Sequence, residues 1–214
     1  MKDSLQALFV RPHELKTREG LPTGSTELDQ FLIWQGIPKG AVSLLVSSHG
    51  RGATSLWGDT AIPLTQQKKW VAWMNSSEHH LCPWSWWQKK MDFSRLLVVS
   101  SPDNRKKFLW ALHELLSLSL FDLIGCDLGE LQLRDSDVLK LSRHARRAQA
   151  AVVLTSANRF VRRSSFYSLI LNFNSPRLKI ERAQHRLTPH TIKRRNTYAD
   201  LVPQLAQNRK ALSS

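Results

Sequence analysis

The sequence predicts an α/β protein built on a doubly wound, mainly parallel sheet with helices on both faces. From residue 41 onward, short apolar runs alternate with helical patterns, and the first run is followed by a glycine-bearing loop. Two further β-rich runs, joined by a Ser-Pro turn, follow the last of these apolar runs. Strands separated by helices imply right-handed crossovers, which produce a parallel sheet that is covered on both faces.

Five apolar runs have the composition of buried parallel strands. They span residues 41–46, 70–74, 95–100, 121–126 and 151–156, and helical patterns fill the gaps at 54–67, 83–91, 104–120 and 135–150. Ahead of them, Ser25 or Thr26 can cap a helix that carries Leu28, Phe31 and Leu32 on one face. The runs YSLILNFN and RLKIERA, at 167–174 and 177–183, predict an antiparallel hairpin that extends the sheet edge.

The chain of 214 residues divides into three parts. Residues 1–20 mix charged and apolar types and predict a short helical segment, residues 21–183 form the α/β core, and residues 184–214 form a basic, polar tail. We expect the tail to bind a partner, because a polar segment that orders on contact suits regulated assembly.

The chain is strongly basic, since 31 Lys and Arg residues outnumber 17 acids and give a formal net charge of +14. Nucleic acid is therefore the first partner to expect, and an ordinary solvated basic surface is the alternative. Cys82 and Cys126 have no spacing typical of a metal site or a disulfide, and no apolar run reaches the roughly 18 residues that span a bilayer. We expect a cytoplasmic protein with reduced thiols and no membrane contact.

Residues 41–55, AVSLLVSSHGRGATS, have the layout of a phosphate-binding loop between a strand and a helix. In the motif G-x-x-x-x-G-K-[ST], backbone N–H groups, the lysine and the helix N-terminus hold the phosphates. The corresponding loop residues here are Ser47, Gly50, Arg51, Gly52, Ala53 and Thr54. Serine replaces the first glycine and alanine replaces the lysine, so the loop predicts a structural turn, with weak binding of a nucleotide or another anion as the alternative.

The order of these features resembles the RecA superfamily over residues 21–183. LPTGSTELD, at residues 21–29, is similar to that family's approach to its core. NSSEHHLCP places Glu78 at the family's catalytic glutamate, and FDLIGCD places Asp127 at its Walker B aspartate. Within the superfamily, the LPTG opening, the lysine-free loop HGRGATS and the basic tail after the hairpin resemble ImuA, a family of accessory factors in bacterial mutagenic repair.

The resemblance implies a role in the bacterial DNA-damage (SOS) response, where the protein supports translesion synthesis beside an ImuB-like polymerase-related protein and an error-prone polymerase. RecA is a further candidate partner. Because the loop lacks its lysine, we expect no catalysis, no cofactor and no metal, and we interpret Glu78 and Asp127 as vestigial. Asp127 can equally cap the next turn. The alternatives are a SulA-like inhibitor of FtsZ and a residual DNA-dependent ATPase or recombinase.

Tryptophans crowd one short helical pattern, where Trp84, Trp86 and Trp87 follow one another closely. Adjacent helix positions point about 100° apart, so one face cannot bury all three and at least one is expected at the surface or at an interface. The tryptophans predicted to lie in the core are Trp57, Trp70, Trp73 and Trp110.

Basic residues carry the strongest functional signal. From Asn158 to Asn196 the only acid is Glu181, and Lys140 shares a helical pattern with three arginines at spacings of three and four. Such one-sided charge favours phosphate contacts that are sensitive to salt and independent of base sequence. The residues predicted to bind DNA are Arg143, Arg146, Arg147, Arg159, Arg162, Arg163, Lys179, Arg182, Arg186, Lys193, Arg194 and Arg195.

Overall fold

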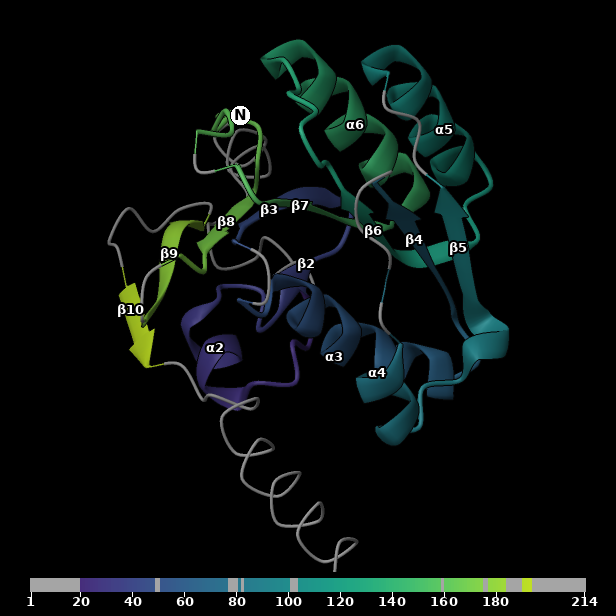
Figure 1. Cartoon of the computed structure of the whole chain (residues 1–214), viewed down its shortest axis with the longest axis vertical. Coiled ribbons are helices and arrows are strands. Elements are labelled where there is room, and N and C mark those ends of the chain that lie inside the picture. Colours follow the sequence, from purple (N-terminus) through teal and green to yellow (C-terminus); the bar gives the residue numbers. More distant parts are fainter. Residues whose placement is uncertain are drawn as a thin grey trace, which may run out of the picture.

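A mixed sheet forms the centre of the molecule in the computed structural model (Figure 1). The structure describes residues 20–48, 51–76, 81, 83–100, 104–158, 160–174, 177–183 and 190–193. The strands are β1 (Gly20–Leu21), β2 (Ile37–Pro38), β3 (Ala41–Val46), β4 (Trp70–Asn75), β5 (Leu96–Ser100), β6 (Phe121–Asp127), β7 (Ala151–Ser156), β8 (Leu169–Asn172), β9 (Arg177–Ala183) and β10 (His190–Lys193). The helices are α2 (Thr26–Phe31), α3 (Ala53–Gln66), α4 (Trp84–Gln88), α5 (Arg105–Ser117) and α6 (Asp135–Ala148), with a 3-10 turn at Phe93–Arg95.

The 8-stranded sheet has the order β10-β9-β8-β3-β7-β6-β4-β5, and β1 pairs with β2 in a separate ribbon. All neighbours from β8 to β5 are parallel, whereas β9 and β10 are antiparallel additions beyond β8. The predicted fold class is therefore confirmed, including the hairpin that extends the sheet. The tail, predicted to begin at residue 184, adds one strand that the sequence did not suggest, because β10 pairs with β9.

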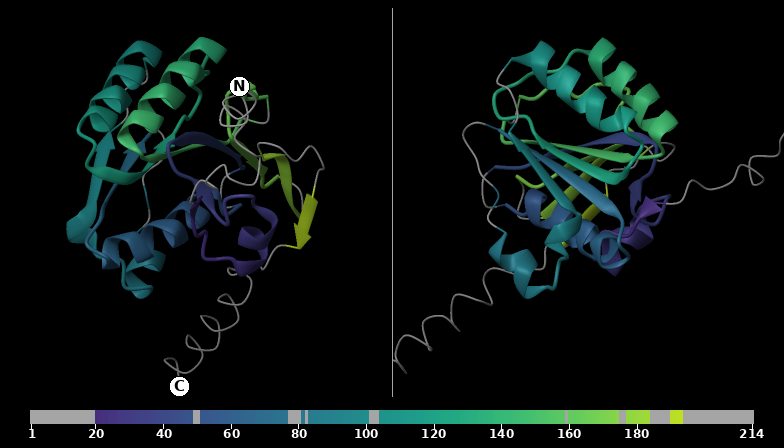
Figure 2. Two further views of the ribbon diagram at one scale, coloured as in Figure 1. Left: turned by 180° about the vertical axis from the view of Figure 1, so that it is seen from behind. Right: turned by 90° about the vertical axis from the view of Figure 1, so that its right-hand side faces the viewer.

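Helices cover both faces of the sheet, as Figure 2 shows from two further directions. On one face, α5 and α6 pack side by side over a core that includes Phe108, Leu112 and Leu141. On the other face, α2, α3 and α4 cover a second core that is rich in tryptophan. Both layers follow from the chain order, since right-handed crossovers place successive helices on opposite faces where the strand order reverses.

Local capping explains where several helices begin. The Ser25 hydroxyl accepts a hydrogen bond from the Leu28 N–H at 3.3 Å and starts α2. Asn104 caps α5 in the same way by accepting from the Lys106 N–H at 2.9 Å. At α6, the Asp137 carboxylate accepts from the Arg134 N–H at 2.8 Å. The predicted cap at Ser25 is therefore confirmed.

Two sequence-based expectations were wrong in detail. The helix expected over 83–91 is only α4, because Lys90 adopts a positive φ of 61° and a 3-10 turn follows. Trp110 is 65% exposed, because α5 turns Phe108 and Leu112 toward the sheet and leaves the position between them outside.

The outer edge of the sheet at β5 is apolar and accessible. Leu97 is 37% exposed and Val98 is 47% exposed, although both lie in a strand. Within the described residues, no strand pairs with β5 on the side away from β4. Among the described strands, the sheet therefore ends at β5 on this side.

Candidate functional site

The described residues of the predicted phosphate loop lie directly after β3 and at the start of α3. Gly52 has a φ of +95°, a left-handed conformation that suits glycine, and it directly precedes the first turn of α3. Ser47 continues the strand, since its N–H donates to the Ser156 carbonyl at 2.9 Å. Gly50 lies outside the described residues. The strand, turn and helix are thus placed as in a phosphate-binding loop.

The described part of this loop has no lysine at the phosphate-binding position. Ala53, at the lysine position, is 4% exposed, and its methyl group belongs to the core under α3. The Ser48 N–H and hydroxyl both reach the Asn174 Oδ1 at 2.6 Å, which ties the loop to the end of β8. Arg51 and Thr54 are exposed. Ser48 is therefore held by a protein contact, and alanine stands where a complete phosphate-binding loop has the lysine that contacts the β- and γ-phosphates.

Asp127 caps a turn at the end of β6. Its carboxylate accepts hydrogen bonds from the Ser76 hydroxyl at 2.8 Å and from the Gly129 N–H at 3.1 Å. Gly129 has a φ of +51°, so the carboxylate stabilises a tight left-handed turn. These contacts bear out the capping alternative for Asp127. Glu78, its predicted companion, lies outside the described residues.

Tryptophan fills the space beneath the loop and α3. The rings of Trp57 and Trp73 meet edge-on with centroids 4.8 Å apart, and Trp86 packs on Trp57 at 5.4 Å. Glycines permit this packing, because a Cβ on Gly58 would lie 1.9 Å from the Trp86 Nε1 and a Cβ on Gly125 would lie 2.3 Å from the Trp73 ring. Sequence reasoning identified Trp57 and Trp73 as core residues, but it did not reveal the role of the two glycines.

The outer face of α6 carries a cluster of basic side chains. Val138, Leu141 and Ala145 turn inward and are buried. Four cations lie on the exposed side: Lys140, Arg143, Arg146 and Arg147. None of the four forms an ion pair within the part of the chain that the structure describes, and the acids of α6 are confined to its first turn. This basic face of α6 therefore presents uncompensated positive charge to solvent.

Two other predicted DNA-binding arginines are held by acids. Arg162 forms a bidentate contact with Asp135, with its Nη2 2.7 Å from Oδ2, and Arg163 lies 2.5 Å from the Glu181 Oε2. The hydrogen bond from Arg162 lowers the pKa of Asp135. Burial of Glu181 opposes its ionisation, but hydrogen bonds from Arg163 and Asn172 outweigh this effect and lower the pKa of Glu181. These arginines stabilise the fold around α6 and β9.

Of the remaining residues predicted to bind DNA, the structure describes the side chain of only one. Lys179 is exposed on β9. The side chains of Arg182 and Lys193 and all of Arg159, Arg186, Arg194 and Arg195 lie outside the described residues. The structure thus brings together only the α6 group of the predicted cations.

No protein-family model matches the chain, and a search of curated protein sequences gives no match. In the described ranges, no group of three or more His, Cys, Asp or Glu side chains could hold a metal ion. No helix within these ranges is both long and apolar enough to cross a lipid bilayer.

Cys126 is buried near the C-terminal end of β6. Desolvation and the neighbouring Asp127 carboxylate raise the pKa of its thiol. A buried, protonated thiol is a poor nucleophile and a poor metal ligand. Cys126 is thus a packing residue, whereas Cys82 lies outside the described residues.

Proposed function

We propose that the protein is a catalytically degenerate, RecA-like accessory factor that binds DNA through the basic face of α6. The uncompensated charge of Lys140, Arg143, Arg146 and Arg147 carries the proposal. Cations spaced on one helix face neutralise successive phosphates and release counterions, which gives affinity for DNA that does not depend on base sequence.

The contacts at the phosphate loop support a role without ATP hydrolysis. Ala53 supplies no charge to a transferred phosphoryl group, and Asn174 fixes the loop without a nucleotide. Asp127 stabilises a turn by contacts that need no metal. The fold serves as a binding scaffold.

The cellular role in this proposal follows from the sequence resemblance to ImuA. The protein acts in the cytoplasm during the SOS response and supports translesion synthesis beside an ImuB-like protein and an error-prone polymerase. The segment after the hairpin binds that partner, and DNA binding by α6 places the assembly at damaged DNA.

The proposal is tested by measuring the affinity of the full chain for a fluorescently labelled DNA oligonucleotide. Replacing Arg143 and Arg147 with Ala weakens binding by roughly tenfold at about 0.1 M salt, because two phosphate contacts are lost. Lys69→Ala is the control, since the Lys69 ammonium is paired with Asp122 at 3.7 Å and belongs neither to α6 nor to the contacts around α4. Equal affinity of the double variant and the wild type contradicts the assignment of α6.

Two outcomes would favour other functions. DNA-stimulated ATP hydrolysis that is lost in Glu78→Gln would restore the enzyme alternative. Direct inhibition of FtsZ polymerisation, unaffected by loss of the α6 arginines, would favour a SulA-like inhibitor.

Co-purification of the full chain with an ImuB-like protein, lost on removal of residues 194–214, supports the proposed partner.

A further inference from the structure

Two tryptophans of α4 form an exposed aromatic pair. Trp84 is 63% exposed and Trp87 is 61% exposed. Their ring centroids lie 5.2 Å apart with an interplanar angle of 30°, so the two indoles form one continuous surface. Trp86 points the opposite way, is 3% exposed and packs against Gly58. The buried ring anchors the short helix, while the pair faces solvent.

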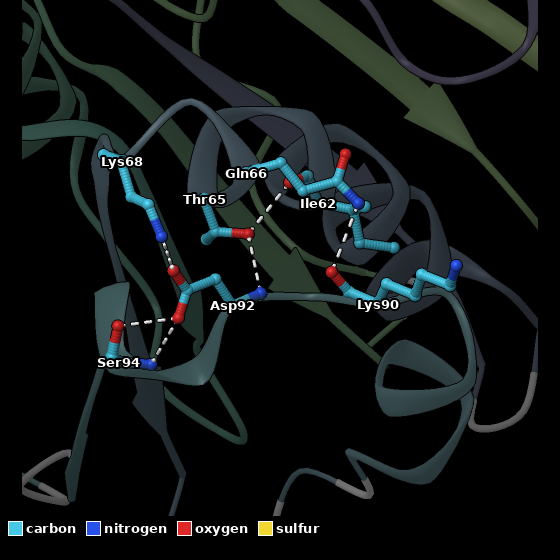
Figure 3. A network of polar contacts seen from close by, with 7 residues as sticks. All are labelled: Ile62, Thr65, Gln66, Lys68, Lys90, Asp92 and Ser94. Atoms are coloured by element: carbon cyan, nitrogen blue, oxygen red, sulfur yellow. Dashed lines mark hydrogen bonds and ion pairs between the residues drawn. The ribbon is translucent and has the colours of Figure 1, made fainter.

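The segment that carries the pair is held firmly against α3. The Asp92 N–H donates to the Thr65 hydroxyl at 3.2 Å, and Gln66 donates to the Lys90 carbonyl at 3.2 Å (Figure 3). Lys68 contacts the Asp92 carboxylate at 2.9 Å, and hydrogen bonds from Ser94 and Lys68 lower the pKa of Asp92 to about 2. Lys89 is paired with Asp59 across the same boundary. The exposed rings therefore project from a fixed support.

Packing of the fold does not require these two rings, because Trp86 already fills the space against Trp57 and Gly58. A pair of exposed indoles is costly in water and marks a binding surface more often than a single exposed aromatic residue does. The segment PWSWWQKK has two lysines and no acid. Lys89 is neutralised by Asp59, so the charge beside the pair comes from Lys90, which forms no ion pair within the described residues. Lys90 is exposed one turn beyond Trp87, to whose carbonyl its N–H donates at 2.9 Å.

We propose that Trp84 and Trp87 form a stacking platform for unpaired bases of single-stranded DNA, with the phosphates beside Lys90. Flat, apolar rings next to cations match a polyanion whose bases are exposed, and such stacking tolerates any base. In a duplex the bases stack on one another, so the platform selects single strands. It lies on the opposite face of the sheet from the basic face of α6 (Figure 1), and it rests on the proposed DNA-binding function.

The test compares two strands that carry the same number of phosphates. One is an oligothymidylate of about 20 nucleotides, and the other has the same length with abasic sugars. The full-length wild type is expected to bind the thymidylate strand about tenfold more tightly, because only that strand can stack. The variant Trp84→Ala/Trp87→Ala is expected to bind both strands with nearly equal affinity.

Trp110→Ala is the matched control, because Trp110 is 65% exposed on α5, on the opposite face. It should keep the preference for bases, as should Trp84→Phe/Trp87→Phe, which retains two aromatic rings and reports on folding. The proposal is overturned if the alanine variant still prefers the thymidylate strand, or if the wild type shows no preference. Arg143→Ala/Arg147→Ala should weaken binding to both strands by a similar factor, which tests α6 separately, so the two proposals fail independently.

Discussion

Ion pairing divides the basic residues into two groups that should respond differently to salt. Arg143 and Arg147 carry charge that no acid of the described chain compensates, whereas Arg162 and Arg163 are paired with Asp135 and Glu181. Each phosphate contact with a single strand contributes about 0.7 to the slope of log affinity against log salt concentration. Loss of two contacts therefore flattens the slope by about 1.4.

The magnitude is large enough to separate the two groups. A fourfold rise in salt, from about 50 to about 200 mM, lowers affinity about 2.6-fold per phosphate contact. Over this rise, the affinity of Arg143→Ala/Arg147→Ala should therefore fall by a factor about seven times smaller than that of the wild type. Arg162→Ala/Arg163→Ala should flatten the slope by less than half as much, because each guanidinium must leave a carboxylate to reach a phosphate.

The assay is fluorescence anisotropy of a labelled single-stranded oligonucleotide, titrated with each variant at several salt concentrations. The circular dichroism spectrum of each variant checks that the fold is kept. If Arg162→Ala/Arg163→Ala flattens the slope as much as Arg143→Ala/Arg147→Ala, the reasoning from ion pairing is wrong, and the paired arginines exchange their carboxylates for phosphates.

Three further predictions concern stability and are checked by urea unfolding. Gly58→Ala should lower the free energy of unfolding by about 1–3 kcal/mol, because its Cβ would meet the Trp86 ring, and an unchanged midpoint would show that this ring moves freely. Asp127→Ala should lower the free energy of unfolding by about 2–4 kcal/mol, because the carboxylate accepts hydrogen bonds from Ser76, Gly129 and Thr155, whereas Asp127→Asn should lower it less. Stabilisation of the wild type, but not of Asp127→Asn, by Mg²⁺ and a nucleotide contradicts the vestigial interpretation. The pKa of Glu181 is lowered from its usual value of 4.5, so the ionised carboxylate stabilises the fold at pH values above 4.5. This contribution is lost as the pH falls through the folded-state pKa. Arg163→Ala should therefore lower the free energy of unfolding at pH 6–7. The further decrease in this free energy between neutral pH and about pH 3 should be smaller in the variant than in the wild type, and an unaltered pH dependence argues against the pair.

The parallel sheet could be predicted from the sequence because its buried strands consist of continuous runs of apolar residues. The run 41–46 is buried at every position, and the hairpin was visible as two β-rich runs around a Ser-Pro turn. β1 and β2 were missed because two residues per strand leave no periodicity to detect. Trp110 was misplaced because its neighbours at 108 and 112 define the buried face only once the orientation of α5 is known.

The candidate site was less accessible to sequence reasoning because its decisive contacts are distant in the chain. Asp135 and Arg162 are 27 residues apart, and Ser48 and Asn174 are 126 apart. A count of charges identified the basic segment, but it could not show which arginines have carboxylate partners. The exposed basic face of α6 was predictable, since a spacing of three and four residues places cations together on any helix.

The open edge at β5 has a consequence for how the protein behaves at high concentration. Within the described residues no strand pairs with the outer side of β5, and an apolar strand at such an edge invites pairing with the same strand of another copy. The net charge of +14 opposes such encounters, and added salt weakens this repulsion because the screening length falls to about 10 Å at 0.1 M. A salt concentration high enough to release DNA therefore also promotes self-association. The same surplus of lysine and arginine sets both the affinity for DNA and the resistance of the protein to self-association.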